Sequence, residues 1–453
     1  MLNRELISKY DVPGPRYTSY PTALAFDANF DSQVFLDACA ASDPEEKLSL
    51  YIHIPFCESL CFYCACNKII SKKKDKTSRY IEVLAQEIAL LGTTMGKRPI
   101  TQLHFGGGTP TYFTPEQMEH LFDLLGEHLN LIADASREYS IEVDPRTVDA
   151  DYLQLLGRRG LNRISFGIQD FGEEVQRVIN RPQSYELCRD TVLAARDAGF
   201  NSIAFDLVYG LPAQSFEGFK STVAQVLTLA PERIALFNYA HLPAAFKAQR
   251  VIDGYERATG DAKLAMMLYA MEEFSAAGYQ QVGMDHFALP TDGLAIAANE
   301  GTMQRNFQGY STESAKDLVG LGVSSISAVN GVYAQNARTL KQYYRSVESG
   351  ISPVDKGYKL NNEDLRRQDI IMSLLTDMRF DFANFQQSFG VDPKQHFKHE
   401  LSELQGFVAD DILSIDDQGV YVTEQGRLIV RNVAMVFDQY LSDDNRKRYS
   451  RTI

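Results

Sequence analysis

The regular alternation of short apolar runs with amphipathic stretches constrains the fold of this chain more than any other feature. Each apolar run is of the kind that forms a buried strand, and each precedes a stretch with helical periodicity. The runs cover 49–55, 100–105, 139–143, 163–168, 202–208 and 233–238, and the first two helices are expected near 77–92 and 115–129. Because strand-helix-strand units join parallel strands by right-handed crossovers, six units in series predict an α/β fold whose parallel sheet curls into a partial (β/α)6 barrel. Barrel enzymes carry their chemistry on the loops that follow the strands.

The two flanks of this barrel have a different pattern. Three prolines and three tyrosines fall within 10–22, a mixture that favours an extended arm over a helix. After about residue 357, helices are expected at 363–378, 393–404 and 424–441, with a hairpin around 416–419. We therefore expect three parts, namely an extended N-terminal arm over 1–45, a catalytic barrel over 46–356, and a mainly helical, winged-helix-like domain over 357–453.

Composition excludes several classes of function. The net charge of −14 opposes general affinity for nucleic acid or for anionic membranes, and the acidic tip of the winged-helix-like part (Asp410, Asp411, Asp416 and Asp417) opposes a DNA partner. A lid over the substrate site is the preferred role for that part. No stretch approaches the ~20 apolar residues of a membrane span, and the first residues do not read as a signal peptide. With only six cysteines in 453 residues, we expect a soluble protein of the reducing cytoplasm.

Four cysteines lie within ten residues, directly after the first apolar run. Cys57, Cys61 and Cys64 have the spacing C-x3-C-x2-C, and Cys66 follows after a single residue. A closed iron-sulfur cubane needs four thiolates, but two cysteines as close as Cys64 and Cys66 cannot easily reach two different iron atoms of one cluster. The run therefore predicts a [4Fe-4S] cluster with one iron open to a cofactor.

Zinc and simple buried thiols are the alternatives to this cluster. Structural zinc sites usually use two separated cysteine pairs, and Cys39 and Cys188 are isolated in the sequence. A disulfide framework does not fit the compartment that the composition indicates.

Polar side chains and glycines stand at or near the ends of the following strands. Three glycines at 106–108 allow a ligand to approach the backbone closely, although such a turn alone is a weak signal. Glu142, Gln169 and Asp206 lie in or after successive apolar runs. Burying a carboxylate is costly unless it is paired, so a structural ion pair is one reading and a ligand hydroxyl or amine is the other.

A set of motifs, taken together, resembles a known family. They are GPRYTSYPT, the cysteine run, HFGGGTP, SIEVDPR, FGIQDF, DLVYGLP, FNYAHLP, MDHFALP, RNFQGY and GRLIVRN, and they extend over nearly the whole chain. They resemble the radical S-adenosylmethionine (SAM) superfamily and, within it, the oxygen-independent coproporphyrinogen III oxidases. The resemblance implies decarboxylation of the propionates on rings A and B of coproporphyrinogen III to vinyl groups, giving protoporphyrinogen IX. It also implies a 5′-deoxyadenosyl radical made from SAM at the cluster, with two SAM molecules bound.

The resemblance also assigns residues. The cluster ligands would be Cys57, Cys61 and Cys64. Contacts to the cluster-bound SAM would come from Tyr51, Gly107, Glu142 and Ile326, and those to the second SAM from Tyr63, Gly108, Thr109, Gln169, Arg181, Asp206 and Ala240. Cys66 would be an active-site residue beside the cluster. The family usually has Phe where this chain has Tyr63, Gly where it has Ala65 and Trp where it has Phe105.

The substrate contacts are less defined. Gln308 and Tyr310 are candidates for the substrate region, with loop packing as the alternative. Arg16, Lys68 and Arg305 lie in or beside motifs and are candidates to bind propionates, because the substrate carries four carboxylates and the protein is acidic.

Two rival functions differ in class. A related haem chaperone shares the three-cysteine loop but lacks the fourth cysteine and the GPRYTSYPT arm, both of which this chain has. A radical SAM enzyme for another substrate is the second rival. The electron donor and acceptor are not identified by the sequence, and the family expectation is a monomer.

Overall fold

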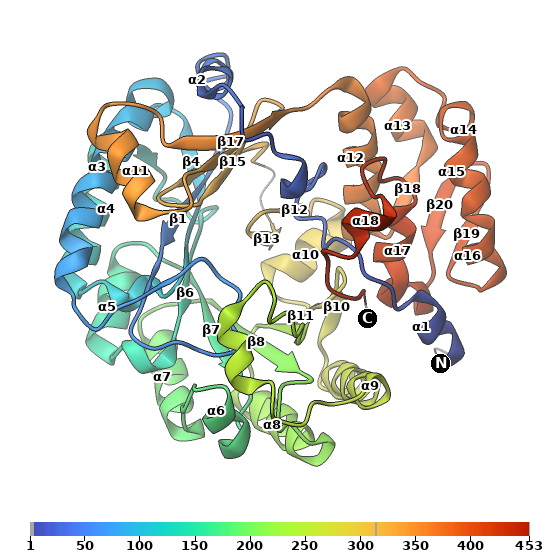
Figure 1. Cartoon of the computed structure of the whole chain (residues 1–453), viewed down its shortest axis with the longest axis horizontal. Helices are drawn as coiled ribbons and strands as arrows, with labels where there is room; N and C mark the ends of the chain where they lie inside the picture. The colour runs from blue at the N-terminus through green and yellow to red at the C-terminus, as the bar shows by residue number, and fades with distance from the viewer. Residues whose placement is uncertain (1–3, 313–314, 453) are drawn as a thin grey trace.

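Six parallel strands joined by helices form the centre of the computed structural model, which describes residues 4–312 and 315–452 (Figure 1). The strands are β1 Leu48–Ile54, β4 Pro99–Gly107, β6 Glu138–Val143, β7 Arg163–Gln169, β8 Ser202–Tyr209 and β9 Arg233–Asn238. Each of them is hydrogen-bonded to the next in this order, so every crossover reaches the neighbouring strand. The predicted partial (β/α)6 barrel is confirmed.

Helices cover the outer face of this sheet. They are α3 Asp75–Met95, α4 Pro115–His128, α5 Ala150–Arg158, α6 Glu173–Val178, α7 Tyr185–Asp197, α8 Phe216–Leu229 and α9 Gly260–Ala276. Ile52, Phe105 and Ile141 lie side by side on β1, β4 and β6, and all three are buried. The Phe105 ring packs against Phe122 of α4 with 5.3 Å between ring centroids. Burial of such side chains, at about 1.5–3 kcal/mol each, holds the helices on the sheet.

The sheet is wider than the sequence pattern predicted. Beyond β9 it continues through the antiparallel strands β11 His286–Ala288 and β10 Gln280–Val282. On the other side, β14 Asp317–Leu321 pairs in parallel with β1, and β15 Ile326–Val329, β16 Val332–Asn336 and β17 Val354–Lys359 follow antiparallel. Smaller elements are β2 Phe56–Cys57, β3 Ile69–Ile70, β5 Asn130–Leu131, β12 Gln304–Asn306, β13 Gly309–Ser311, α10 Gly293–Glu300 and α11 Leu340–Glu348. The added strands have two to six residues, too few to show a clear period in the sequence.

The N-terminal arm contains two helices that the prediction of an extended segment did not include. They are α1 Arg4–Tyr10 and α2 Ser32–Ala40, and the residues 11–22 between them are free of helix, as expected. Three of the arm's prolines lie within that middle stretch and Pro44 follows α2, so none of them opposes either helix. The carboxylate of Asp31 accepts a hydrogen bond from Gln33 N and caps α2.

The C-terminal part stands beside the barrel and consists of short helices with a small sheet (Figure 1). Its elements are α12 Asn362–Asp377, β18 Arg379–Asp381, α13 Phe382–Phe389, α14 Pro393–His396, α15 Lys398–Glu403, α16 Gln405–Ala409, β19 Leu413–Ile415, β20 Gly419–Val422, α17 Val430–Met435 and α18 Asp443–Arg446. The three strands pair in the order β18-β20-β19, and the predicted hairpin is β19-β20. The expected helical domain is therefore present.

Two helices predicted for this part are interrupted in the structure. The stretch 393–404 holds two short helices, which meet at the buried Phe397. The expected helix over 424–441 consists of a 3-10 turn at Gln425–Ile429 and then α17, which ends at Met435. Asp438 accepts hydrogen bonds from Tyr17 Oη at 2.9 Å and from Tyr440 N, and such side-chain bonding competes with continuation of a helix.

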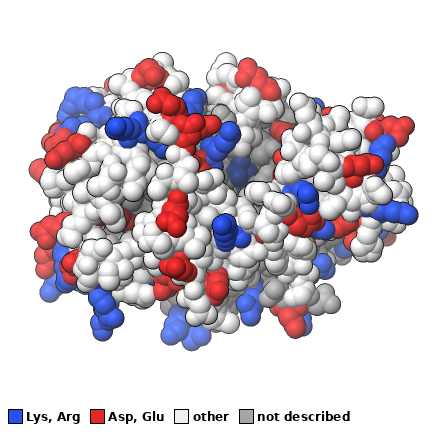
Figure 2. Space-filling model, turned by 90° about the horizontal axis from the view of Figure 1, so that it is seen from above, with Lys and Arg blue, Asp and Glu red and all other residues white. Residues whose placement is uncertain are grey.

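Over the described residues, each helix is too short or too polar to cross a bilayer. On the face that Figure 2 shows, acidic and basic side chains are interspersed.

Candidate active site

The carboxyl ends of the central strands open into a cavity of about 660 Å³, which we call the cysteine cavity. Most of the predicted site residues line it: Cys57, Cys61, Tyr63, Cys64, Cys66, Gly107, Gly108, Thr109, Glu142, Gln169, Arg181 and Asp206. The parallel topology brings these residues together, because the loops after neighbouring strands lie at the same edge of the sheet.

The cysteine loop is held from several sides. Cys57 in β2 pairs with Ile70 in β3, so the two ends of the loop meet. Phe62 N donates to the Ile179 carbonyl at 3.0 Å, and the Asn180 amide donates to the Leu60 carbonyl at 2.8 Å. These bonds fix the loop against the end of α6.

Lys68 completes this attachment. Its ammonium group donates to the carbonyl oxygens of Cys64 at 2.9 Å and Cys66 at 3.4 Å. A side chain engaged in this way holds the loop, so Lys68 is better described as a loop-positioning residue than as the substrate contact that the sequence suggested.

The thiols themselves suit an iron-sulfur cluster. All of them are free, the Thr109 hydroxyl donates to Cys57 Sγ at 3.4 Å, and the Arg181 guanidinium lies 3.6 Å from Cys61 Sγ. A hydrogen bond from the Cys66 thiol lowers the pKa of Cys64 to about 6, and the same bond raises the pKa of Cys66. Cys64 is thus readily deprotonated to the thiolate, the form that binds iron, whereas burial raises the pKa of Cys57 to about 11.

Within the described residues, no three His, Cys, Asp or Glu side chains converge as the ligands of one metal ion. A tetrahedral zinc site needs such convergence. A cubane instead takes one thiolate at each of three separate irons, and the donor set of the cysteine loop fits that arrangement.

The glycines after β4 are required by close packing. Gly107 has φ of +117°, and a Cβ atom there would lie 2.8 Å from the ring of His53. A Cβ atom on Gly108 would lie 2.7 Å from the Pro55 carbonyl. Only glycine fits at both positions, and this close packing places both residues in the lining of the cysteine cavity.

Glu142 is less buried than the sequence suggested. Its side chain is 46% exposed, toward the cysteine cavity. It accepts a hydrogen bond from Gly107 N at 3.3 Å, and the His104 ring lies 3.3 Å from its carboxylate. Although burial opposes ionisation, the His104 ring and the Gly107 N–H hold the pKa of Glu142 below its usual value. Glu142 is therefore an anion that can accept hydrogen bonds from a bound cation or hydroxyl.

Arg181 lies in the wall of the cysteine cavity and binds the groups around it. It is 8% exposed, pairs with Asp144 at 3.0 Å and donates to the Gly167 carbonyl at 2.7 Å. Nearby, Gln169 has φ of +65°, a conformation that turns the chain at the end of β7. Burial and the negative charge of Glu142 raise the pKa of Asp206 to about 6. Arg146 pairs with the same Asp144 at 2.7 Å, so this wall carries two fixed cations, and the pKa of Asp144 is lowered while that of Asp206 is raised.

Besides Arg16 and Arg305, five predicted residues lie outside this cavity lining. The Tyr51 hydroxyl is 3.0 Å from His53 Nδ1, and its ring stacks on His104. Ile326 lies in β15. The Tyr310 hydroxyl donates to the Leu375 carbonyl at 3.1 Å and accepts from Met284 N, which favours the packing role. Gln308 accepts from Ser49, and its buried Nε2 has no partner among the described residues.

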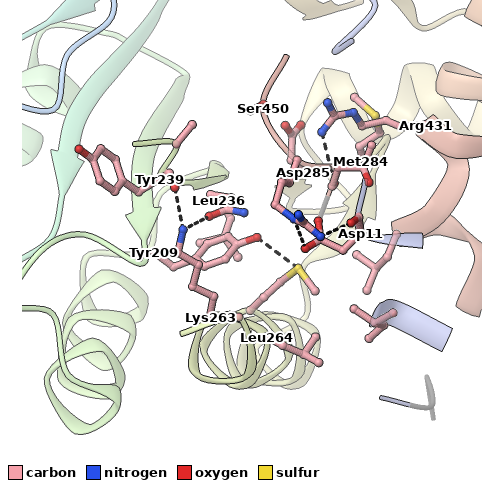
Figure 3. Close-up of a pocket in the computed structure, with 18 of the residues that line it drawn as sticks. Asp11, Tyr209, Leu236, Tyr239, Lys263, Leu264, Met284, Asp285, Arg431 and Ser450 are labelled. Carbon is pink, nitrogen blue, oxygen red and sulfur yellow. Dashed lines mark hydrogen bonds and ion pairs between the residues drawn. The ribbon is translucent and has the colours of Figure 1, made fainter. Parts of the chain in front are cut away.

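Ala240, the fifth, lines a second cavity of about 620 Å³, which we call the arm-tail cavity. It lies between the ends of β8 and β9, helix α9, the N-terminal arm and the C-terminal tail, and Figure 3 shows Lys263, Asp285 and Arg431 around it. Gln249 connects the two cavities, since its amide donates to the carbonyls of Tyr63 at 3.0 Å and Ala240 at 3.2 Å. Sequence reasoning missed Gln249 and Lys263, because no motif marks them.

Comparison with known proteins agrees with this geometry. A model of the Radical SAM superfamily matches residues 51–226, and a model of the HemN C-terminal domain matches residues 360–429. An oxygen-independent coproporphyrinogen III oxidase of Pseudomonas aeruginosa is 44% identical over 99% of this chain and 98% of its own length. The Escherichia coli protein of that name is also 44% identical, with the same coverage. A solved coproporphyrinogen III oxidase of Escherichia coli, named as a radical SAM enzyme, superposes with a TM-score of 0.93 at 43% identity, covering 97% of this chain and 99% of that one.

A partial barrel with a three-cysteine loop at its strand ends defines a radical SAM enzyme. Sequence identity of 43–44% over nearly the full length distinguishes one family within that class. The chain belongs to the family of oxygen-independent coproporphyrinogen III oxidases.

Proposed function

We propose that this protein converts coproporphyrinogen III to protoporphyrinogen IX by oxidative decarboxylation of the ring A and B propionates to vinyl groups. One observation carries the proposal: the free thiols of the C-x3-C-x2-C loop open onto the same cavity as Gly107, Glu142 and Asp206 at the strand ends. Membership of the oxidase family indicates that coproporphyrinogen III is the substrate.

Cys57, Cys61 and Cys64 would hold three irons of a [4Fe-4S] cluster, and the fourth would take the amino and carboxylate groups of SAM. When bound, the cluster and SAM together would supply a 5′-deoxyadenosyl radical, whose chemistry is removal of a hydrogen atom from a propionate β-carbon. The protein's part is to bind and orient. Gly107 and Gly108 let SAM approach the backbone, and the Glu142 carboxylate accepts hydrogen bonds from it.

A second SAM molecule is part of the proposal. The side chains of Gln169, Arg181 and Asp206 face the cysteine cavity beside Tyr63. Gln249 ties the backbone of Tyr63 to that of Ala240 on the adjoining cavity. This continuity supports a second ligand that extends from the cysteine cavity toward the arm-tail cavity.

The arm-tail cavity is the proposed place for the unreacted propionates. Arg16 lies 3.7 Å from Asp285 and over the Phe237 ring, with its side chain 41% exposed. Lys263 lines the same cavity and donates to the Tyr239 carbonyl at 2.7 Å. Arg16 stands where a substrate carboxylate can replace a long ion pair. Lys263 also donates to the Asn238 side chain at 3.0 Å, so it must give up a bond to bind a propionate. Arg305 donates to the carbonyls of Arg16 and Tyr17 and so holds the arm.

Anaerobic assay of the reconstituted protein tests the function. Protein loaded with iron and sulfide, then incubated with coproporphyrinogen III, SAM and reduced methyl viologen, should yield monovinyl and divinyl products on chromatography. Omission of SAM is the control and should leave the substrate unchanged. Absence of any vinyl product, together with stoichiometric haem binding, would favour the haem chaperone instead. A cytoplasmic location and a monomeric state remain predictions from the sequence.

A further inference from the structure

A run of cations lies beside the cysteine loop, in a chain whose net charge is −14. Lys72, Lys73, Lys74 and Lys76 occupy the start of α3 and the residues before it, all of them exposed, and exposed Arg79 follows one turn later. Arg338, Lys341 and Arg345, in and before α11, extend this surface. We call these eight residues the basic patch.

The two parts of the patch are in contact. The Arg79 guanidinium lies over the ring of Tyr344 in α11, 4.7 Å from its centroid, and binds Glu348 at 2.8 Å. The Asn67 side chain, at the exit of the cysteine loop, donates to the Arg338 carbonyl at 3.3 Å. The loop exit, α3 and α11 therefore present one continuous surface.

Few carboxylates neutralise this surface, although the exposed Asp75 lies within the lysine run. Lys74 pairs with Glu58 at 3.2 Å, and Arg79 pairs with Glu348. Among the described residues, Lys73, Lys76 and Lys341 form no ion pair with a carboxylate. The rest of the molecule is acidic, so the patch creates a local positive electrostatic potential. This potential steers an anionic partner to one place on the surface.

The patch also lies next to the proposed cluster. Ser71 N, immediately before the lysines, donates to the carbonyl of the ligand Cys57 at 3.0 Å. Lys72 lines the cysteine cavity, and the partner of Lys74 is the residue that follows Cys57. Electron transfer between proteins requires a short path, so a donor bound here would stand close to the cluster.

We infer that the basic patch is the docking surface for an acidic, low-potential electron-carrier protein. The inference rests on the proposed function, which needs an electron from outside the chain for each SAM cleaved. The carrier loses one electron, the oxidised cluster gains it, and no bond forms or breaks in this transfer. Complementary charge would supply mainly rate and orientation, and therefore a strong dependence on salt.

Two triple variants of equal charge test the inference. The patch variant carries Lys73→Gln, Lys76→Gln and Lys341→Gln, and the control carries Lys97→Gln, Lys359→Gln and Lys398→Gln at exposed positions elsewhere. The probe is a flavodoxin, an acidic flavin carrier. Calorimetric titration of the oxidised carrier into reconstituted protein at low salt gives the Kd, and stopped-flow bleaching of the cluster by the reduced carrier gives the rate.

In the patch variant we expect Kd to rise and the reduction rate to fall, each about tenfold or more, with a flatter salt dependence. Reduction and vinyl formation driven by methyl viologen should change less than twofold, which separates this test from that of the proposed function. Equal losses in both triple variants, or equal losses with carrier and viologen, would overturn the inference. Loss of binding to phosphatidylglycerol vesicles with carrier binding intact would overturn it too, in favour of a membrane contact.

Discussion

Replacement of Cys61 by serine should abolish the cluster and the activity together. A serine hydroxyl is a poor iron ligand, and the proposed cluster takes Cys57, Cys61 and Cys64 as its three protein ligands. Loss of a partner that merely orients a metal ligand costs about 10–100-fold, so loss of the ligand itself should cost more than about 100-fold in vinyl formation. Iron and acid-labile sulfide after anaerobic reconstitution, measured beside the product assay, check this.

Cys188→Ala is the matched control. Cys188 is buried in α7 among core residues and does not line the cysteine cavity. This variant should retain full iron content and activity, apart from a modest loss of stability. A Cys61→Ser protein that kept four irons and wild-type turnover would refute the assignment of the ligand.

Glu142→Gln should weaken SAM binding without loss of the cluster. The substitution keeps the size of the side chain but removes the negative charge, which the His104 ring and the Gly107 N–H favour in the folded protein. A hydrogen bond to a charged group contributes about 1.5–3 kcal/mol, which corresponds to a Kd for SAM about 10–100-fold higher. Calorimetric titration of SAM into the reconstituted protein measures it.

Glu127→Gln, at an exposed position of α4, provides the comparison. It removes one carboxylate far from the strand ends and should leave SAM affinity unchanged. Iron content should equal that of the unaltered protein in both variants. If the two variants bound SAM with the same Kd, Glu142 would have no part in the cofactor site.

The local pattern of the sequence was sufficient to predict the central sheet. The bounds of β9 agree with prediction, and those of β1 and β7 differ by one residue at most. Strands buried on both faces are long apolar runs, so their signal is strong. The cysteine spacing and the strand-end residues could be placed for a related reason, since parallel topology brings loop residues to one edge whatever the details of packing.

Contacts between distant parts of the chain could not be predicted in this way. Arg431 donates to the carbonyls of Gly14 at 2.6 Å and Pro15 at 3.0 Å, and Pro13 pairs with Arg451 at the other end of the chain. Such contacts between the two ends of the chain depend on tertiary geometry. Gly14, Pro15 and Arg431 lie in motifs, but the motifs do not predict that they meet. The arm and the tail, which these contacts join, form one side of the arm-tail cavity. The same limit applies to Glu142, whose exposure depends on a cavity rather than on its strand.

The most direct test of the account is whether the cluster has an iron that SAM can bind while Cys66 remains free. The measurement is the electron paramagnetic resonance spectrum of the reduced, reconstituted Cys66→Ser protein, recorded before and after addition of SAM. The account predicts a four-iron cluster whose spectrum shifts on SAM addition, as in the unaltered protein. A cluster that is lost, or a spectrum that SAM does not change, would contradict the assignment of Cys57, Cys61 and Cys64 as the complete set of protein ligands.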